Sequence, residues 1–383
     1  MPRVLVDATA IPAQLRGVGR YLDNLLPALV AAGADVVALA QARDRQHFAE
    51  LGIDCLPGVS VPAGRLGRLA WEQYGLPGVA ARAGADLLHS PHYTSPLRWT
   101  GPLAVTVHDA TFFSNPEWHT RAKGPFFRAA TRLAARRADV CIVPAQATAD
   151  ELHSRLGLDP DRVQVAHLGV DTGLFRPPDD AARARARAAA GLEPDEEFVA
   201  FLGTLEPRKN VPALIRGWVA ACATLQAGRR PPALVLAGGA GWDRELEAAV
   251  AAVPAGLRLL RPGYLPLADL PGLLGAAAVV AYPSLGEGFG LPVLEAMACG
   301  AAVLTTRRLA LPEVGGEAVA YAEPTDDSIA DALGWLLSDP QLREQLGQAG
   351  LARAARFSWA ACAEAHLRGY EHALRRSRQE GRR

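Results

Sequence analysis

The sequence predicts an α/β protein built from two doubly wound parallel sheets. Short runs of β-branched residues and leucine alternate with longer segments rich in Ala, Leu and Arg, as strands alternate with helices around a parallel sheet. The chain has 383 residues, which is more than one hydrophobic core usually serves. Because 50% of the residues are apolar, two cores can be filled, and we expect two domains of roughly 150 to 200 residues each.

Ten segments have the composition and length of buried strands. They are bounded by glycine, proline or polar residues and are rich in Val, Leu, Ile and Ala, a pattern typical of strands in a parallel sheet. In the first half they are residues 3–6, 36–40, 87–89, 104–107 and 140–143, and in the second half residues 198–202, 233–237, 257–260, 279–281 and 302–305.

A change in composition marks the joint between the halves. An extended segment ends at Pro177 and Pro178 and is followed by an Ala/Arg-rich helical pattern over residues 180–190, which is typical of a domain linker. We therefore predict an N-terminal domain over residues 1–172 and a second domain over 173–358. The tail, residues 359–383, is predicted to be one long helix that crosses back to the first domain.

Charge and targeting patterns exclude several classes of protein. The 40 basic and 40 acidic residues balance, which argues against a nucleic-acid binder that needs a positive field over most of its surface.

The five cysteines lack metal-binding or C-x-x-C spacing, so we expect no metal site and a reducing compartment. No signal peptide is recognisable, and the longest uncharged apolar stretch, residues 270–284, is too short to span a membrane. We therefore expect a cytoplasmic protein.

A glycine-rich segment after the predicted strand at 279–281 is the strongest functional signal. Its three glycines, Gly286, Gly288 and Gly290, precede a helix that starts near Pro292. Glycine lets the backbone turn sharply and brings N–H groups close to a ligand, and a helix start attracts anions. The segment therefore predicts an anion site for phosphate or sugar hydroxyls.

Two acids flank this helix start. Glu287 lies among the glycines and Glu295 about one turn into the helix, where a carboxylate can accept hydrogen bonds from a ribose. The alternative is that both acids only decorate the helix start, where the helix dipole favours them. The position after a strand favours the binding interpretation, because open α/β sheets bind ligands there.

A second basic signal follows the predicted strand at 198–202. Arg208 supplies a planar fork of donors and Lys209 a compact ammonium group, a pair suited to a diphosphate. Lys209 is one of only two lysines in the chain. A solvated basic loop is the alternative.

The N-terminal glycines differ from a dinucleotide fingerprint. Gly17 and Gly19 precede a helix, but Leu22 stands where the fingerprint needs a third glycine. The helix start can still approach a phosphate or an acceptor, and a simple tight turn is the alternative.

A His-Asp pair ends the predicted strand at 104–107. His108 and Asp109 are candidates for contacts with sugar hydroxyls or with the acceptor. The alternative is a strand-end histidine satisfied by backbone groups.

Together these segments resemble glycosyltransferase family 4, of the retaining GT-B type, over nearly the whole chain. The resemblance rests on Glu-x7-Glu from Glu287 to Glu295, on Glu-Pro-Arg-Lys-Asn at 206–210 and on Leu-Pro-Glu-Val-Gly-Gly at 311–316. It implies the GT-B fold, in which two Rossmann-like domains face a central crevice, the first binding the acceptor and the second the nucleotide-sugar donor.

The resemblance also implies a role for each matching residue. Arg208 and Lys209 would bind the donor diphosphate and Glu295 the ribose, while Glu287 would meet the donor sugar and phosphates. His108 would contact the primary hydroxyl of the sugar. The remaining matches to donor-binding positions are Gly17, Gly19, Gly288, Phe289, Gly290 and Leu291. One departure is Val-Pro-Ala-Gln-Ala at 143–147, where relatives often carry a hydroxyl residue that caps the next helix.

The activity implied is retaining, metal-independent transfer of a sugar to a hydroxyl of a glycan or lipid-linked acceptor. Glu287, Arg208, Lys209 and His108 would be the catalytic residues, and Asp109 would bind the acceptor. The donor would be GDP-mannose or a UDP-sugar, and no cofactor is implied. Val-His-Asp with Asn-Pro-Glu at 115–117 looks most like mannosyltransferases. A nucleotide-sugar 2-epimerase and a noncatalytic nucleotide-sugar-binding subunit are the alternatives.

A basic segment at residues 121–137 predicts a surface contact. It carries six basic residues and no acid, interleaved with Phe126, Phe127 and Leu133. Such a segment suits peripheral contact with the anionic inner face of a cell membrane. An ordinary solvated helix face is the alternative.

Overall fold

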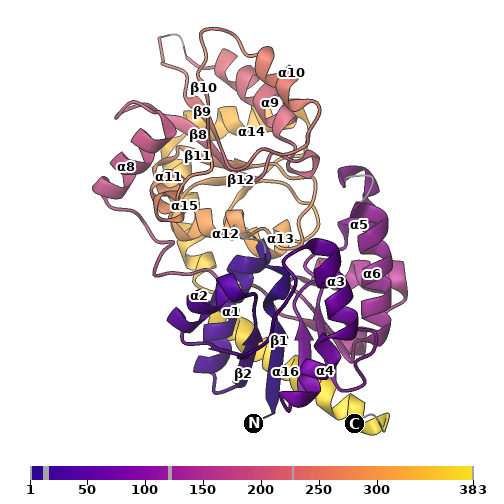
Figure 1. Cartoon of the computed structure of the whole chain (residues 1–383). Coiled ribbons are helices and arrows are strands. Elements are labelled where there is room, and N and C mark those ends of the chain that lie inside the picture. Colours follow the sequence, from indigo (N-terminus) through magenta and orange to yellow (C-terminus); the bar gives the residue numbers. More distant parts are fainter. Residues whose placement is uncertain (1, 12–16, 120–122, 227, 382–383) are drawn as a thin grey trace. The chain divides into compact units, whose positions relative to one another are not determined.

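The chain folds into two compact α/β units. The computed structural model describes residues 2–11, 17–119, 123–226 and 228–381. The first unit comprises residues 1–169 and 358–383, and the second comprises residues 170–357. Figure 1 shows the elements of each unit, each with one sheet and its own helices.

The first unit contains a parallel sheet of seven strands in the order β3-β2-β1-β4-β5-β6-β7. The order runs outward from β1 in both directions, which defines a doubly wound sheet. Its strands are β1 (Arg3–Asp7), β2 (Asp35–Leu39), β3 (Asp54–Cys55), β4 (Leu87–Ser90), β5 (Leu103–Thr106), β6 (Val140–Val143) and β7 (Val163–Val165).

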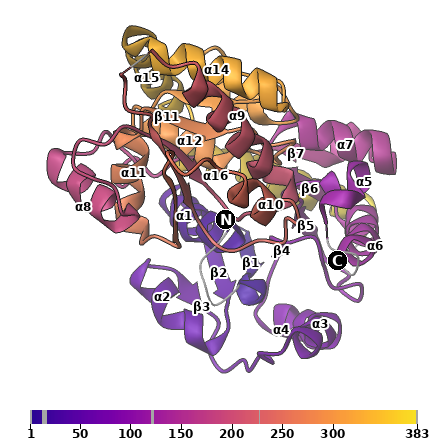
Figure 2. The same ribbon diagram turned by 90° about the horizontal axis from the view of Figure 1, so that it is seen from above.

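Helices cover both faces of this sheet. Buried residues of α4, α6 and α7 share one apolar cluster with Leu5, Leu88 and Val105 of the strands, and α5, α6 and α7 lie on the same side in Figure 2. On the other face, α16 packs against α1, β6 and β7. The helices are α1 (Gly17–Ala31), α2 (Arg45–Glu50), α3 (Arg65–Tyr74), α4 (Leu76–Arg82), α5 (Thr111–Ser114), α6 (Lys123–Arg137), α7 (Gln146–Leu156) and α16 (Trp359–Gln379).

The second unit contains a parallel sheet of six strands in the order β10-β9-β8-β11-β12-β13. Its central strand β8 is buried along residues 198–201, as expected where helices cover both faces. The strands are β8 (Phe198–Leu202), β9 (Ala233–Ala237), β10 (Leu259–Gly263), β11 (Val279–Tyr282), β12 (Val303–Thr305) and β13 (Ala320–Tyr321).

Helices of the second unit pack in pairs, with α9 beside α14 and α8 beside α11 (Figure 1). The ends of α8 follow directly from sequence, because Asp179 caps its first turn by accepting from the Ala182 N–H at 2.7 Å and Gly191 ends it in a left-handed conformation. The helices are α8 (Asp180–Ala190), α9 (Val211–Ala223), α10 (Leu246–Ala251), α11 (Leu270–Ala276), α12 (Leu291–Ala298), α13 (Leu311–Gly315), α14 (Asp326–Ser338) and α15 (Pro340–Ala354).

Each of the ten predicted strands is present, displaced by no more than a few residues, and the predicted fold class is confirmed. Three additional strands, β3, β7 and β13, were not predicted. The helix predicted at 180–190 is α8, and α16 accounts for most of the predicted C-terminal helix. At the start of α7, Ala145 provides no side-chain cap, in agreement with the hydroxyl that the sequence lacks there.

Candidate functional site

The candidate site of the second unit lies where its strand order reverses. β8 and β11 are neighbours at the centre of the sheet, yet their connections run to opposite edges. Loops that follow the carboxyl ends of two such strands diverge and leave room for a ligand. β8 leads to the short 3-10 helix η5 (Pro207–Lys209), and β11 leads through residues 283–290 to α12.

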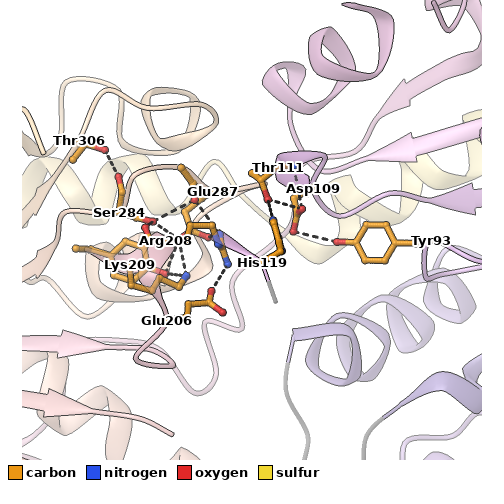
Figure 3. A network of polar contacts seen from close by, with 12 residues as sticks. Tyr93, Asp109, Thr111, His119, Glu206, Arg208, Lys209, Ser284, Glu287 and Thr306 are labelled. Carbon is orange, nitrogen blue, oxygen red and sulfur yellow. Dashed lines mark hydrogen bonds and ion pairs between the residues drawn. The ribbon is translucent and has the colours of Figure 1, made fainter. Parts of the chain in front are cut away.

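Two cations from η5 converge on one carboxylate from the loop after β11 (Figure 3). Lys209 Nζ lies 2.6 Å from Glu287 Oε1, and Arg208 Nη1 pairs with Glu287 Oε2. The other end of the guanidinium donates to Glu206 Oε1 at 2.8 Å. We call the group that surrounds this carboxylate the Glu287 cluster: Glu206, Arg208, Lys209, Tyr282, Ser284 and Glu287.

Hydroxyl and backbone groups fix the position of Glu287. Ser284 Oγ lies 2.7 Å and Tyr282 Oη 3.0 Å from Glu287 Oε1. Thr306 Oγ1 donates to the Ser284 carbonyl at 2.6 Å, and the Leu285 N–H donates to the Arg208 carbonyl at 2.8 Å. These bonds join the loops after β8, β11 and β12 into one ordered arrangement.

The charges in the cluster determine its ionisation. Burial alone would raise the pKa of Glu287, but the adjacent Arg208 and Lys209 outweigh it and lower this pKa to about 2. Burial, together with Arg208, lowers the pKa of Lys209, which Glu287 opposes. Burial and the Glu287 charge raise the pKa of Tyr282 well above its usual value. Near neutral pH the cluster therefore contains a carboxylate held between two cations and a neutral phenol.

The start of α12 requires a glycine. Gly290 has φ of +105°, and a Cβ there would lie 2.9 Å from Leu311 Cδ2. Leu291 is the first helical residue, so its N–H belongs to the first turn, whose donors have no partner within a helix. The segment Gly288–Leu291 thus leads directly from Glu287 into a helix start.

Two further predicted residues of this segment have buried side chains. Phe289 is 4% exposed, and its ring packs edge-on against that of Phe357 with 5.9 Å between ring centroids, so the ring belongs to the core. Glu295 is 2% exposed within α12. The structure therefore brings Arg208, Lys209 and Glu287 into contact, while Glu295 lies deeper in the same helix that begins beside them.

In the first unit, His108 follows β5. Its Nε2–H donates to the Pro91 carbonyl at 2.8 Å, and burial lowers its pKa. A neutral imidazole that donates from Nε2 carries a lone pair on Nδ1. His108 is therefore a hydrogen-bond acceptor at that atom.

Asp109 is held by neighbouring side chains (Figure 3). Tyr93 Oη donates to its Oδ2 at 3.1 Å, and Thr111 Oγ1 donates to its Oδ1 at 3.0 Å. His119 Nε2 lies 3.0 Å from Thr111 Oγ1. Tyr93, Thr111 and His119 were not singled out from the sequence, because nothing in their spacing shows that they meet Asp109.

The predicted glycine helix lies beside His108. Gly17 is the first residue of α1 and Gly19 is buried within it, while the preceding residues 12–16 lie outside the described part of the chain. Two residues further along α1, Tyr21 packs edge-on against His108 with 4.9 Å between ring centroids. The structure therefore brings the start of α1 and His108 together through Tyr21.

Tyr21 also belongs to a set of buried polar groups behind His108. His366 Nδ1 lies 2.8 Å from the Cys362 carbonyl, to which it donates, so the neutral ring accepts at Nε2. Tyr21 Oη donates to that Nε2 at 2.6 Å. Thr106 Oγ1 lies 3.1 Å from Tyr21 Oη and is the donor in this pair.

The series continues through β4 to α16. His89 Nε2 donates to Thr106 Oγ1 at 2.8 Å, and Tyr370 Oη donates to His89 Nδ1 at 2.9 Å. Burial lowers the pKa of His366 to about 4 and that of His89 well below its usual value. Each hydroxyl or ring N–H thus donates once and in one direction. We call this set the buried network: Tyr21, His89, Thr106, Cys362, His366 and Tyr370.

The basic segment forms α6, although residues 121–122 lie outside the described part of the chain. Two of its arginines turn inward, since Arg128 donates to the Phe112 carbonyl at 3.1 Å and Arg137 to that of Trp99. Phe126 and Leu133 are 40% and 46% exposed. Across the described residues, no helix combines the length and apolar character that crossing a membrane requires.

Comparison with known proteins identifies the family. The family described as Glycosyltransferase Family 4 matches residues 15–174, and Glycosyl transferases group 1 matches residues 182–353. The chain is 30% identical over 293 residues to O-antigen chain mannosyltransferase B from Escherichia coli, covering 74% of both chains. It is 34% identical over 317 residues to D-inositol 3-phosphate glycosyltransferase from Mycobacterium avium, covering 76% of this chain and 70% of the relative.

The fold is shared with solved structures. The crystal structure of Anabaena Alr3699/HepE in complex with UDP and glucose superposes with a TM-score of 0.73 at 19% identity, covering 96% of this chain and 99% of that one. The two sheets described above are thus those of a GT-B fold. The chain belongs to glycosyltransferase family 4 and is a glycosyltransferase.

Proposed function

We propose that this enzyme binds the diphosphate of a nucleotide-sugar at the Glu287 cluster and transfers the sugar with retention of configuration. The observation that carries the proposal is the convergence of Arg208 and Lys209 on Glu287 at the reversal point of the second sheet. Because Glu287 orders both cations, little side-chain entropy remains to be lost when a phosphate reaches them.

Arg208 and Lys209 would stabilise the leaving diphosphate. As the glycosidic bond breaks, negative charge grows on the phosphate oxygen, and preorganised donors at that position lower the barrier. A planar guanidinium and a compact ammonium together suit several phosphate oxygens. In this scheme the acceptor hydroxyl arrives on the face from which the phosphate departs and gives its proton to the departing phosphate.

The segment after β11 would complete the donor site. Backbone groups of Gly288, Phe289, Gly290 and Leu291 would meet the sugar and phosphates, supported by the glycine-dependent start of α12. Glu287 would contact the sugar, and Glu295 would accept hydrogen bonds from the ribose. The buried Phe289 ring supports a role for its backbone alone.

Residues of the first domain would contact the sugar and the acceptor. The Nδ1 lone pair of His108 suits a hydrogen bond from the primary hydroxyl of the sugar. Asp109 would bind the acceptor, and the helix start at Gly17 and Gly19 would approach the donor. Residues 1–172 are accordingly proposed as the acceptor domain, 173–358 as the donor domain, and 359–383 as a helix joined to the acceptor domain.

Mannose is the proposed sugar and GDP-mannose the first donor to test, with UDP-sugars second. The similarity to an O-antigen chain mannosyltransferase supports mannose, and the UDP bound to Alr3699/HepE supports a nucleoside diphosphate. The acceptor would be a hydroxyl of a glycan or of a lipid-linked molecule. The similarity to D-inositol 3-phosphate glycosyltransferases adds an inositol phosphate to the acceptors worth testing.

Peripheral membrane contact through residues 121–137 is part of this proposal. An apolar hollow of about 260 Å³ lies between α3 and α6 and is lined by Leu69, Leu97, Phe126 and Leu133 among others. Exposed apolar side chains beside arginines suit an anionic lipid surface. Flotation with acidic vesicles at low salt tests this point, and failure to co-migrate would remove it.

A donor screen tests the whole proposal. The melting temperature would be measured with GDP-mannose, UDP-glucose, UDP-N-acetylglucosamine and dTDP-rhamnose, because a bound ligand stabilises the fold by mass action. Transfer from the stabilising donor is then measured with and without candidate acceptors. We expect one donor to stabilise the enzyme and to turn over only with an acceptor. Release of an epimerised free sugar without acceptor would favour the 2-epimerase, and no stabilisation by any donor would contradict the proposal.

A further inference from the structure

A second charged site lies in the first unit, at the end of the strands that is remote from His108. The helices α6 and α7 each precede a strand, β6 and β7 respectively, so both helices end where those strands begin. His108 and Asp109 follow the carboxyl end of β5 instead. Because all strands of the sheet are parallel, His108 lies at the carboxyl ends of the strands and the second site lies at their amino ends.

Five arginines line a pocket of about 300 Å³ at the amino ends of these strands. They come from α6, α7, α16 and the short 3-10 helix η4 (Pro160–Arg162), and the end of α16 lies beside α6 (Figure 2). We call this site the arginine pocket; its arginines are Arg132, Arg136, Arg155, Arg162 and Arg376.

Positive charge exceeds negative charge in the arginine pocket. Asp159 is the acid among its lining residues, and Glu380 pairs with Arg376 at 3.0 Å. Five arginines less two acids leave a local charge of +3. Among the described residues, Arg132, Arg136 and Arg155 form no ion pair within 4 Å. Gathering like charges costs free energy, which the carboxyl ends of α6 and α7 offset in part and a bound anion would offset further.

Buried donors point to the same conclusion. Arg162 Nη2 donates to the carbonyls of Ala135 at 2.9 Å and Arg136 at 3.2 Å, which fixes its guanidinium at the end of α6. Within the described part of the chain, the Nε atoms of Arg162 and Arg376 are buried and have no hydrogen-bond acceptor. Buried donors are almost always paired, and an oxyanion supplies both the acceptors and the missing charge.

We propose that the arginine pocket binds a phosphate or diphosphate group. Its volume is at the small end of ligand pockets, and arginine forks suit the oxygens of a phosphate. The group can belong to a soluble phosphate compound or to a lipid headgroup, since α6 also carries Phe126 and Leu133 on its exposed side. The site lies at the opposite end of the strands from His108, so its ligand anchors or stabilises the first domain rather than reacting.

Hydrogen–deuterium exchange of the full-length enzyme locates the ligand. Exchange would be measured at low salt with inorganic pyrophosphate, with phosphatidylglycerol vesicles and with phosphatidylcholine vesicles. We expect protection in residues 132–137 and 155–162, which is separable from any protection that pyrophosphate causes at residues 206–209 and 284–291. Protection by pyrophosphate identifies soluble phosphates as ligands, and protection by phosphatidylglycerol alone identifies a lipid headgroup. No protection of the first two segments by any probe would overturn the proposal.

Matched variants test the residues. The Arg155→Gln/Arg376→Gln enzyme should bind the protecting probe at least about tenfold more weakly, because two charge-assisted contacts are lost. Arg82→Gln, at an exposed arginine of α4, is the control and should bind as the unmodified enzyme does. If the Arg155→Gln/Arg376→Gln enzyme has a much lower melting temperature than the unmodified enzyme, the Arg132→Gln/Arg136→Gln enzyme provides a second test. Unchanged affinity in both double variants would show that the arginine pocket is not the site.

Discussion

Tyr21 Oη lies 2.6 Å from His366 Nε2, so a hydrogen bond joins α1 to α16 across 345 positions of the sequence. The same Tyr21 ring packs edge-on against His108. The C-terminal helix therefore holds in place a side chain that touches a predicted substrate contact. This relationship connects the packing of α16 with the position of His108, a candidate site residue of the first unit.

Replacing Tyr21 with Phe should destabilise the enzyme by about 1 to 3 kcal/mol, because His366 Nε2 loses its buried donor and Thr106 Oγ1 its acceptor. The ring and its contact with His108 remain. Tyr74→Phe is the control, since Tyr74 is 70% exposed, and it should change stability by less than about 0.5 kcal/mol. Urea unfolding measures both, and equal effects would contradict the assigned role of the network.

Stability should fall as pH falls below about 6.5. The folded pKa of His366 is lowered to about 4, whereas an unfolded histidine titrates near 6.5. Between these pH values the unfolded chain binds a proton at this residue that the folded chain does not bind. The free energy of unfolding therefore falls by about 3 kcal/mol through this residue as pH falls toward 4.

His366→Gln checks the source of this pH dependence. Glutamine keeps one donor and one acceptor but does not titrate. Unfolding free energies at pH 7 and pH 5 should therefore differ less in the variant than in the unmodified enzyme. An identical pH dependence would assign the effect to other groups, such as His89 and His108, whose pKa values burial also lowers.

The sequence predicted the central strands better than the edges of each sheet. Central strands such as β8 are continuous apolar runs, because helices bury both of their faces. The three strands that were missed, β3, β7 and β13, are two or three residues long and lie at sheet edges. β10, another edge strand, was predicted too early, because its pairing with β9 shifts register between Leu260 and Gly263. Such short or irregular pairing leaves no periodic pattern to detect.

The candidate site divides in the same way. Arg208, Lys209 and Glu287 were selected from local motifs, and the structure brings them into contact. Tyr282 and Ser284 were not selected, although both contact Glu287, because their role depends on how two loops meet. The buried network was missed entirely, since its bonds join residues as far apart as His89 and Tyr370. Hydrogen bonds across such separations appear only when the sheet and helices are assembled.

Replacing Lys209 with Ala should lower kcat/KM for sugar transfer by about 100- to 1000-fold, the usual effect of removing one preorganised donor to developing negative charge. Arg185→Ala is the control, because it also removes one cation from the second unit. The Arg185 side chain is 61% exposed, and its Nε lies 3.9 Å from Asp269 Oδ1. Steady-state rates with the donor found in the screen measure both variants. Near-normal transfer by the Lys209 variant would refute its assigned role.

Replacing Gly290 with Ala should cost about 1 to 3 kcal/mol, because alanine is strained at φ of +105° and its Cβ would lie 2.9 Å from Leu311 Cδ2. Donor affinity should fall with it, since the strain is at the start of α12. Gly256→Ala is the control, because a Cβ there has no described heavy atom within 4 Å. If the two variants show equal melting temperatures and donor affinities, the helix start does not depend on glycine.

Replacing Glu287 with Gln should cost about 3 kcal/mol without ligand, because Arg208 and Lys209 would lose a buried counter-charge. A bound diphosphate supplies negative charge to the same cations. The stability difference from the unmodified enzyme should therefore shrink when saturating UDP or GDP is present. This dependence on ligand separates a donor site from an ion pair that serves only the fold.

Glu197→Gln provides the matched comparison, because Glu197 also pairs with two arginines in this unit but is 30% exposed. Its loss should cost less than about 1 kcal/mol and should not respond to the nucleotide. Urea unfolding of the three proteins, each with and without nucleotide, measures both differences. A Glu287 penalty that stays constant on adding either nucleotide would show that no diphosphate reaches Arg208 and Lys209.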